Sequence, residues 1–289
     1  MIGIGLYYKP KNENEIEVNG KLEDLDDGIG HDITHIVTLF KQELGYDVFP
    51  ADNDLEKAET FTWNKTDLMR FLRDRSMELD ASTYDGLLLV LSCHGVENHI
   101  ITSDYRKIKK TDIHRVFSES GKSRDIPRVF VFDSCEGSKD HDRLRGIGKA
   151  GRSAVDDDWK CDEDVQPPNV QWGRDQKGPD YKLAVLNAAN AEFQSKTNGR
   201  KGSYFITNWA AKLRANIFER NNARFFSEIC AEVQAYLHDD EQIQHSTHTF
   251  NDGTEYIKFV RNGASPALSR PIDDQDGGPD TNGVQLSRN

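Results

Sequence analysis

Hydrophobic positions along the chain follow two spacings, which predict strands and helices in alternation. Short apolar runs predict strands at Ile2–Tyr8, Tyr46–Phe49, Leu87–Leu91, Arg128–Phe132, Leu183–Leu186 and, last, Glu255–Val260. Apolar residues three and four apart predict helices from His31 to Gly45, from a cap at Thr66 or Asp67 to Met77, near Asp112–Phe117, and at Tyr204–Arg214 and Phe225–Leu237. Apolar strands that alternate with helices indicate an α/β fold, with a mainly parallel sheet flanked by helices on both faces.

Two stretches interrupt this alternation. Residues 138–181 contain Asp156-Asp157-Asp158 and Pro167-Pro168 and have almost no aliphatic periodicity. A segment this long without regular structure is unusual inside a compact domain and is normally functional or disordered. From residue 263 to 289 the chain is rich in Pro, Gly, Asp and Ser, which predicts a disordered tail. The pattern therefore divides the chain into regions 1–137, 138–181, 182–262 and 263–289.

Composition narrows the classes of partner. The formal charge of −12 over 289 residues argues against nucleic acid and against an anionic membrane surface, because both require a basic face. No apolar run reaches the roughly 18 residues of a membrane span, and the N-terminus lacks a basic region before its apolar residues. The four cysteines are scattered, which favours a reducing compartment. We therefore predict a cytoplasmic protein.

The chemistry is concentrated at the ends of two predicted strands. One strand ends at Ser92-Cys93-His94-Gly95, and the other ends at Asp133-Ser134-Cys135-Glu136-Gly137. Because ligands bind beyond the carboxyl ends of strands in open α/β sheets, His94 and Cys135 face each other if the strands are neighbours. A histidine can take the proton of a cysteine, whose pKa of about 8.5 leaves little thiolate at neutral pH. The backbone N–H groups of Gly95 and Cys135 are candidate donors to an oxyanion.

Two other uses of these residues are less favoured by the sequence. Cys93 is the rival nucleophile, but it precedes His94 on an alternating strand end and is expected to point away. A metal site built from Cys93, His94, His99 and Cys135 lacks the paired ligand spacing that zinc sites show. We therefore expect a cysteine hydrolase with no metal and no cofactor.

The two motifs together resemble the caspase-like cysteine peptidases, a superfamily of caspases, paracaspases and metacaspases. In caspases the nucleophile motif is Q-A-C-[RQG]-G, with a histidine about 50 residues upstream; here the separation of His94 and Cys135 is 41 residues. Gly30-His31-Asp32 is similar to the loop before the first caspase helix. Gly202-Ser203-Tyr204-Phe205-Ile206 is similar to the start of the small-subunit helix.

The resemblance implies a caspase-like three-layer sandwich. Region 1–137 would be the large-subunit region and 182–262 the small-subunit region, joined by a linker at 138–181. In the family this linker is often cut to activate a zymogen; the alternative is a disordered insertion with no such role. The last strand, at Tyr256–Val260, resembles the edge through which caspases form homodimers, and an exposed edge strand favours such pairing. The partners implied are a protein or peptide substrate and a second copy of the chain.

Departures from the caspase pattern bear on specificity. Asp133 stands at the glutamine position of the caspase motif, and the position of the first substrate-binding arginine falls near Gly28, beside Asp27. Glu192 follows the small-subunit strand. Acidic residues at these three positions, Asp133, Asp27 and Glu192, favour cleavage after Arg or Lys, as in metacaspases and paracaspases. Arg200 and Lys201 leave cleavage after Asp as the alternative.

Two further hypotheses remain open at this point. A caspase fold that has lost activity could serve as an interaction scaffold, although the chain retains both His94 and Cys135. A cysteine hydrolase that acts on an amide other than a peptide bond would use the same dyad.

Overall fold

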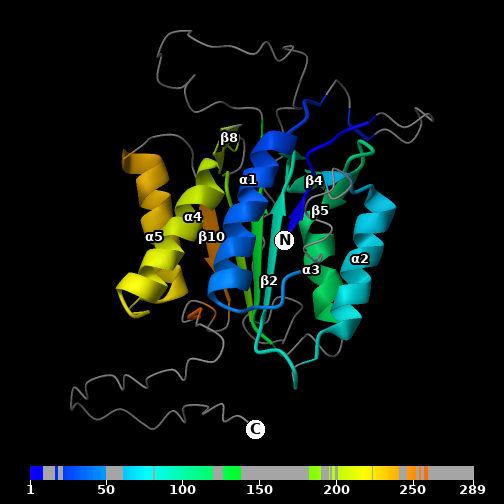
Figure 1. Ribbon diagram of the computed structural model, residues 1–289. Helices are drawn as coiled ribbons and strands as arrows, with labels where there is room; N and C mark the ends of the chain where they lie inside the picture. Colours follow the sequence, from blue (N-terminus) through cyan, green and yellow to red (C-terminus); the bar gives the residue numbers. More distant parts are fainter. Residues whose placement is uncertain are drawn as a thin grey trace, which may run out of the picture.

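A mainly parallel sheet lies at the centre of the computed structural model (Figure 1). Among the described residues its strands are ordered β1 (Ile2–Gly3), β2 (Leu87–Ser92), β6 (Arg128–Asp133), β7 (Leu183–Asn187) and β10 (Thr247–Phe250). The first four run parallel to one another, and β10 runs antiparallel to β7. The structure describes residues 1–8, 17–18, 22–49, 61–80, 82–119, 126–137, 182–189, 195, 197–198, 201–222, 224–240, 246–251, 254 and 257–259.

The sheet separates two hydrophobic cores. Alternate side chains of a strand point to opposite faces, so that Val90, Val129, Val131 and Leu186 belong to one core, and Leu89, Leu91, Phe130 and Phe132 belong to the other. Because the strands are apolar on both faces, each face needs a covering layer of helices.

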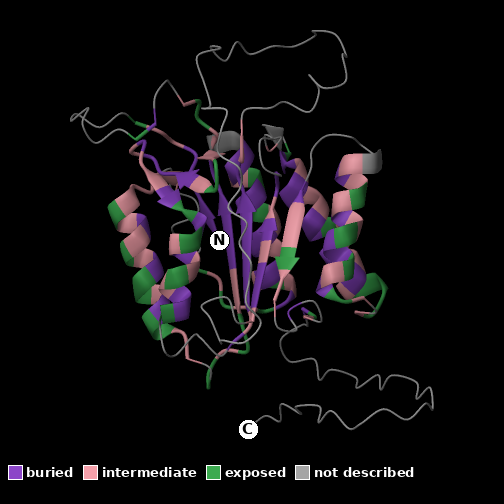
Figure 2. Cartoon of the chain, turned by 180° about the vertical axis from the view of Figure 1, so that it is seen from behind, coloured by how far each residue is buried: buried purple, intermediate pink, exposed green. Residues whose placement is uncertain are grey.

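Helices cover both faces. The first core is covered by α1 (Asp26–Val37), which continues as the π-helical turn η2 (Thr38–Glu43), and by α4 (Tyr204–Arg214) and α5 (Phe226–Ala235). The second is covered by α2 (Lys65–Glu78) and α3 (Lys110–Glu119). Figure 2 shows the buried strands between these two layers. The predicted three-layer α/β arrangement is therefore confirmed.

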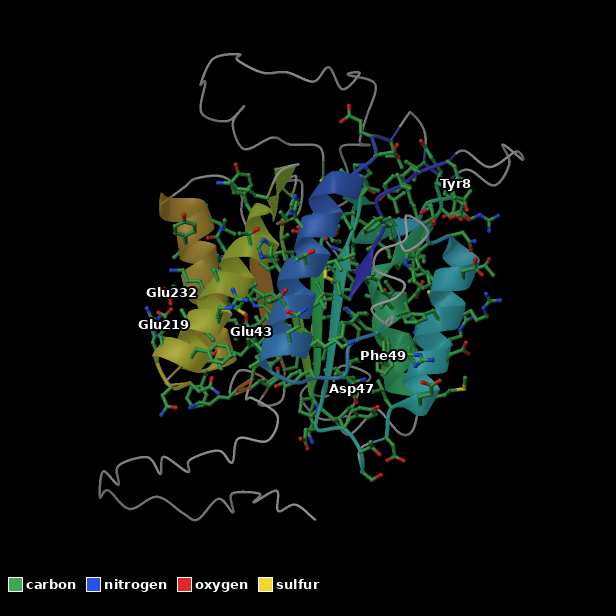
Figure 3. The ribbon with its side chains drawn as sticks, viewed as in Figure 1. Tyr8, Glu43, Asp47, Phe49, Glu219 and Glu232 are labelled. Carbon is green, nitrogen blue, oxygen red and sulfur yellow. The ribbon has the colours of Figure 1, made fainter. Side chains whose placement is uncertain are left out.

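Ion pairs join the helices of the first layer at its surface. Arg214 on α4 binds Glu43 at the end of η2 with an N–O distance of 2.6 Å. Lys212, also on α4, binds Glu232 on α5 at 2.8 Å. Glu43 and Glu232 are labelled in Figure 3, on the side of the molecule formed by α1, α4 and α5. Pairs this exposed typically contribute at most about 1 kcal/mol each, so the apolar core is the main contact between these helices.

Three additional strands precede α3 and were not predicted. They are β3 (Gly95–Val96), β4 (His99–Ile101) and β5 (Lys107–Lys109), which form a small antiparallel sheet. The turn between β3 and β4 consists of Glu97 and Asn98, both with positive φ. This small sheet begins directly after His94, so it lies next to the end of β2.

The structure corrects several predicted element boundaries. The first strand ends at Gly3 rather than Tyr8, because Gly5 and Leu6 donate their N–H groups to the carbonyl of Phe61 instead of to β2. Residues 46–49 are not a strand, since the N–H of Tyr46 returns to the carbonyl of Phe40 and closes the preceding helical turn.

The second helix begins earlier than predicted, and its cap is Asn64. The Asn64 side chain accepts the N–H of Asp67, which satisfies a donor of the first turn. Thr66 and Asp67 therefore lie inside the helix.

The predicted last strand is wrong where the structure describes it. Residues 257–259 are not a strand; the carbonyl of Ile257 accepts the N–H of Phe226, and Phe259 packs against the rings of Phe40 and Phe226. The side chain of Phe259 is thus packed among the helices that cover the first core. The described edge strand beside β7 is β10 instead.

The predicted linker at 138–181 and the predicted tail at 263–289 lie outside the described residues. Within the described part of the chain, no helix is both long enough and apolar enough to cross a membrane.

Candidate active site

The ends of β2 and β6 bring two loops together at one edge of the sheet. The strands pair in parallel from Leu87 opposite Arg128 to Ser92 opposite Asp133. His94 and Cys135 each lie two residues beyond this last pair. The contact between the loops is close at Gly95, where an added Cβ atom would lie 2.6 Å from the carbonyl oxygen of Cys135. A glycine is needed here because no side chain fits between the two backbones.

The imidazole of His94 is held by two groups from the N-terminal part of the chain. The backbone N–H of His94 donates to the hydroxyl of Tyr7 at 2.9 Å, and the centroids of the Tyr7 and His94 rings lie 4.9 Å apart. Its Nε2 lies 2.8 Å from the carbonyl oxygen of Glu23. A carbonyl oxygen can only accept, so in this hydrogen bond Nε2 carries the hydrogen and Nδ1 keeps its lone pair.

Burial lowers the pKa of His94 below its ordinary value of 6.5, against the opposing effect of the hydrogen bond to Glu23. The imidazole is therefore mainly neutral at pH 7, which is the state in which it can accept a proton.

The cysteines at this edge differ in environment. Cys93 is only 4% exposed, and burial raises the pKa of its thiol to about 12. Cys135 is partly exposed, whereas Cys93 and Cys230 are buried. Because the thiolate is the nucleophilic form and must be reached by a substrate, Cys135 is the better placed of the described thiols.

A pair of buried carboxylates lies beside the loop that carries Cys135. Asp133 ends β6 and is 3% exposed, and Asp32 on α1 is fully buried. The hydroxyl of Ser92 lies 3.2 Å from Asp32 and 3.1 Å from Asp133, and its one hydrogen serves only one of them at a time. Ser195 donates to Asp133 at 2.7 Å, and the N–H of Ser203 donates to Asp32 at 2.7 Å.

The two carboxylates affect each other's ionisation. Burial, together with the charge of Asp133, raises the pKa of Asp32 to about 8. Burial also raises the pKa of Asp133, against the opposing hydrogen bonds of the serines and the nearby charge of Lys110. Two buried carboxylates that share one hydroxyl favour a state in which the pair holds a proton, or one in which a cation binds between them.

The predicted site residues are placed as follows. His94, Gly95, Cys135 and Asp133 lie together at the ends of β2 and β6. Asp27 lies in the first turn of α1, and its side chain is outside the described part of the structure. Glu192 is also outside the described residues.

Sequence reasoning missed Asp32, Tyr7 and the carbonyl of Glu23. Asp32 could have been found, because it lies three residues after Ile29 and four before Ile36 on the apolar stripe of its helix. The contacts of Tyr7 and Glu23 depend on the path of a loop and have no comparable pattern in the sequence.

The part of the chain that the structure describes contains no cluster of three or more His, Cys, Asp or Glu side chains arranged to hold a metal ion. The groups described at the sheet edge are a thiol, a mainly neutral imidazole and two buried carboxylates.

Comparison with known proteins relates this arrangement to a family. Residues 19–256 match the family model described as the caspase domain. Among solved structures, the fold is similar to caspase-1 from Spodoptera frugiperda, with a TM-score of 0.60 and 16% identity over 84% of this chain and 86% of that chain. At this identity the structural match shows the fold alone. The search of curated proteins found no match.

Proposed function

Since the chain belongs to the caspase-domain family, we propose that it is a cysteine endopeptidase with Cys135 as nucleophile and His94 as base. The observation that carries the proposal is the close contact of the His94–Gly95 loop with the backbone of Cys135 at the ends of two paired strands. The lowered pKa of His94 and the partial exposure of Cys135 support these roles.

The proposed reaction has two stages. In the first, the Cys135 thiol gives its proton to His94, and the sulfur attacks the carbonyl carbon of the scissile peptide bond. The backbone N–H groups of Gly95 and Cys135 donate to the resulting oxyanion. His94 then protonates the leaving amine, and a thioester remains on Cys135. In the second stage, water gives a proton to His94 and attacks the thioester, which releases the acid product and the free thiol.

The hydrogen bond from His94 Nε2 to the Glu23 carbonyl fixes the ring while Nδ1 exchanges the proton. This bond also stabilises the imidazolium that forms, because its donor becomes charged.

We further propose cleavage after Arg or Lys. The pair formed by Asp32 and Asp133 supports this specificity, since a guanidinium or ammonium group bound beside it would neutralise two buried carboxylates. An aspartate side chain of a substrate would bring a further carboxylate beside this pair and be repelled. In both cases the interaction is with the substrate residue before the scissile bond.

Two cysteine variants test the nucleophile. We expect Cys135→Ala to abolish peptide hydrolysis and Cys93→Ala to keep most of it, because Cys93 is buried and its pKa is high. Labelling by a thiol-reactive peptide probe at neutral pH, read by mass spectrometry, should occur at Cys135. Equal loss of activity in both variants would contradict the assignment. A wild-type chain that neither hydrolyses peptides nor labels at Cys135 would favour the interaction scaffold.

A panel of fluorogenic peptides tests specificity. Peptides with Arg or Lys before the scissile bond should be cleaved, and those with Asp should not. We expect Asp133→Asn and Asp32→Asn each to lower kcat/KM for the Arg peptide by about 10–100-fold, the range expected when one charge-assisted contact of about 1.5–3 kcal/mol is lost. Asp74 is an exposed carboxylate on α2, so Asp74→Asn is the matched control and should leave kcat/KM unchanged. Preferred cleavage of the Asp peptide would contradict the proposed pocket.

A further inference from the structure

Lys110, the first residue of α3, is a charged side chain in the interior of the protein. It is 2% exposed, and its ammonium lies 4.9 Å from the centre of the Phe132 ring. The ammonium donates to the carboxylate of Glu136 and to the side-chain oxygen of Asn187, the latter at 3.0 Å. An interior charge is strongly unfavourable unless it is paired and hydrogen-bonded, so these partners explain how Lys110 can be buried.

Glu136 connects this ammonium to the nucleophile and to the loop after His94. It directly follows Cys135, and its second carboxylate oxygen accepts the N–H of Asn98 at 2.8 Å. Its backbone carbonyl accepts the N–H of Glu97 at 3.2 Å. The N–H of Lys110 in turn donates to the carbonyl of Asn98 at 3.0 Å. The turn between β3 and β4 is thus bound from both sides.

Asn187 extends the same network to a third strand. It is the last residue of β7, the neighbour of β6 in the sheet. The Lys110 ammonium therefore joins the segments that follow β2 and β6 to the end of β7. These are the strand ends at which the proposed active site is built.

We propose that Lys110 is a positioning residue, which through Glu136 holds Cys135 in register with the His94–Gly95 loop. This inference rests on the proposed peptidase function. Lys110 acts through its contacts rather than on the substrate, because its ammonium is enclosed and bound to Glu136 and Asn187. Burial lowers the pKa of Lys110 to about 7, against the opposing effect of the neighbouring acidic groups Cys93, Cys135 and Asp133, which favour its charged form.

The alternative is a pair that only supports folding. The two explanations predict different results when the charges of Lys110 and Glu136 are removed together. If the pair matters only because an unpaired charge is unfavourable, replacing both partners by neutral residues should restore everything that replacing one partner loses. If the contacts set the position of Cys135, the neutral pair should restore stability but not the rate.

The test compares Lys110→Met with the double variant Lys110→Met/Glu136→Gln in the full chain, using the Arg peptide. Lys109→Met is the matched control, since Lys109 is exposed and precedes Lys110 directly. For Lys110→Met we expect kcat to fall about 100-fold, the effect typical of a small displacement of a reacting group, with little change in KM. The double variant should regain thermal stability while kcat stays low. Lys109→Met should match the wild type in both.

The rate of Cys135 alkylation by iodoacetamide between pH 5 and 9 gives a second readout. In the double variant we expect this profile to move to higher pH relative to the wild type, because Cys135 no longer faces His94 in the same geometry. The paired charges of Lys110 and Glu136 are removed together, so their direct effects on the thiol oppose each other. Lys109→Met should leave the profile unchanged.

The outcomes distinguish failure of the positioning role of Lys110 from failure of the proposed peptidase function. Wild-type kcat in the double variant, or in Lys110→Met itself, would overturn the positioning role while leaving the peptidase function intact. An unchanged alkylation profile in the double variant would also overturn it. A wild-type chain that lacks both hydrolysis and labelling at Cys135 would overturn the proposed function, and the positioning role with it.

Discussion

Gly95 is the residue at which the two loops of the proposed active site meet. Its missing side chain leaves room for the carbonyl of Cys135, the Cβ of Ser134 and the carbonyl of His99, which a methyl group would meet at 2.6, 2.8 and 2.9 Å. Two of these atoms belong to the backbone and cannot rotate away. We expect Gly95→Ala to fold, to lose about 1–3 kcal/mol of unfolding free energy through overpacking, and to lose about 100-fold in kcat because the loops must separate.

Gly30 provides the control for this substitution. It lies inside α1, and an added methyl group would find its nearest neighbour at 4.0 Å. Gly30→Ala should therefore raise the melting temperature, since alanine is favoured over glycine in a helix by about 1 kcal/mol. Calorimetry and peptide hydrolysis measure both effects. A Gly95→Ala variant with wild-type kcat would show that the contact at Gly95 is unimportant for the reaction.

At the scale of elements, α1 carries a carboxylate into the core, and this should make stability depend on pH. The pKa of Asp32 is raised by burial from 3.8 to about 8. Between these values the folded state holds a proton that the unfolded state has released. The free energy of unfolding contributed by Asp32 is therefore full below pH 4 and is lost as the pH rises through about 8, by at most about 1.4 kcal/mol per pH unit.

Denaturant unfolding between pH 4 and 9 measures this dependence. We expect the wild type to lose stability across this range more steeply than Asp32→Asn, which cannot ionise at that position. Asp74→Asn, with its exposed side chain, should follow the wild type. Parallel curves for the wild type and Asp32→Asn would contradict a protonated Asp32 in the folded state. An arginine-based inhibitor should reduce the difference, because its cation would favour the ionised pair.

Helices and strands were predictable from the sequence wherever burial imposes a period. β2, β6, β7, α4 and α5 follow from apolar spacing alone, and the strand ends then identify His94 and Cys135. The sheet β3–β5 was missed because its strands are two or three residues long and show no period. Asp32 and Lys110 are buried at positions of apolar helix stripes, so each interrupts the pattern beside the candidate site. Their partners, Ser92 and Glu136, come from distant segments that only the folded chain brings near.

At the scale of the whole molecule, β10 ends the described sheet on one side and could pair with a second copy. Its partner on the inner side is β7, in register from Thr247 opposite Asn187 to Phe250 opposite Ala184. Edge strands present unpaired backbone groups, and a charged side chain there opposes pairing. We expect a dimer in sedimentation velocity experiments and a monomer for Thr249→Lys, whose side chain is exposed. Thr111→Lys, at an exposed position of α3, should remain dimeric. A wild-type monomer at all concentrations would contradict the predicted homodimer.

The order of the strands also indicates what cleavage of the chain between β6 and β7 would do. The two strands are paired from Arg128 opposite Leu183 to Phe132 opposite Asn187, and both contribute to the two cores. A cut within 138–181 would therefore leave the two pieces bound to each other. That segment contains Arg145, Lys149 and Arg152 among other basic residues.

An enzyme that cuts after Arg or Lys should consequently process its own chain in this segment. We expect purified wild-type protein to yield two co-migrating pieces in size-exclusion chromatography, with mass spectrometry placing the new C-terminus at Arg or Lys. Cys135→Ala should remain a single chain, because it lacks the nucleophile. A cut in the Cys135→Ala protein would indicate another protease, and a cut after one of Asp156-Asp157-Asp158 in the wild type would contradict specificity for basic residues. The same site chemistry is thus tested on a peptide bond that the chain itself supplies.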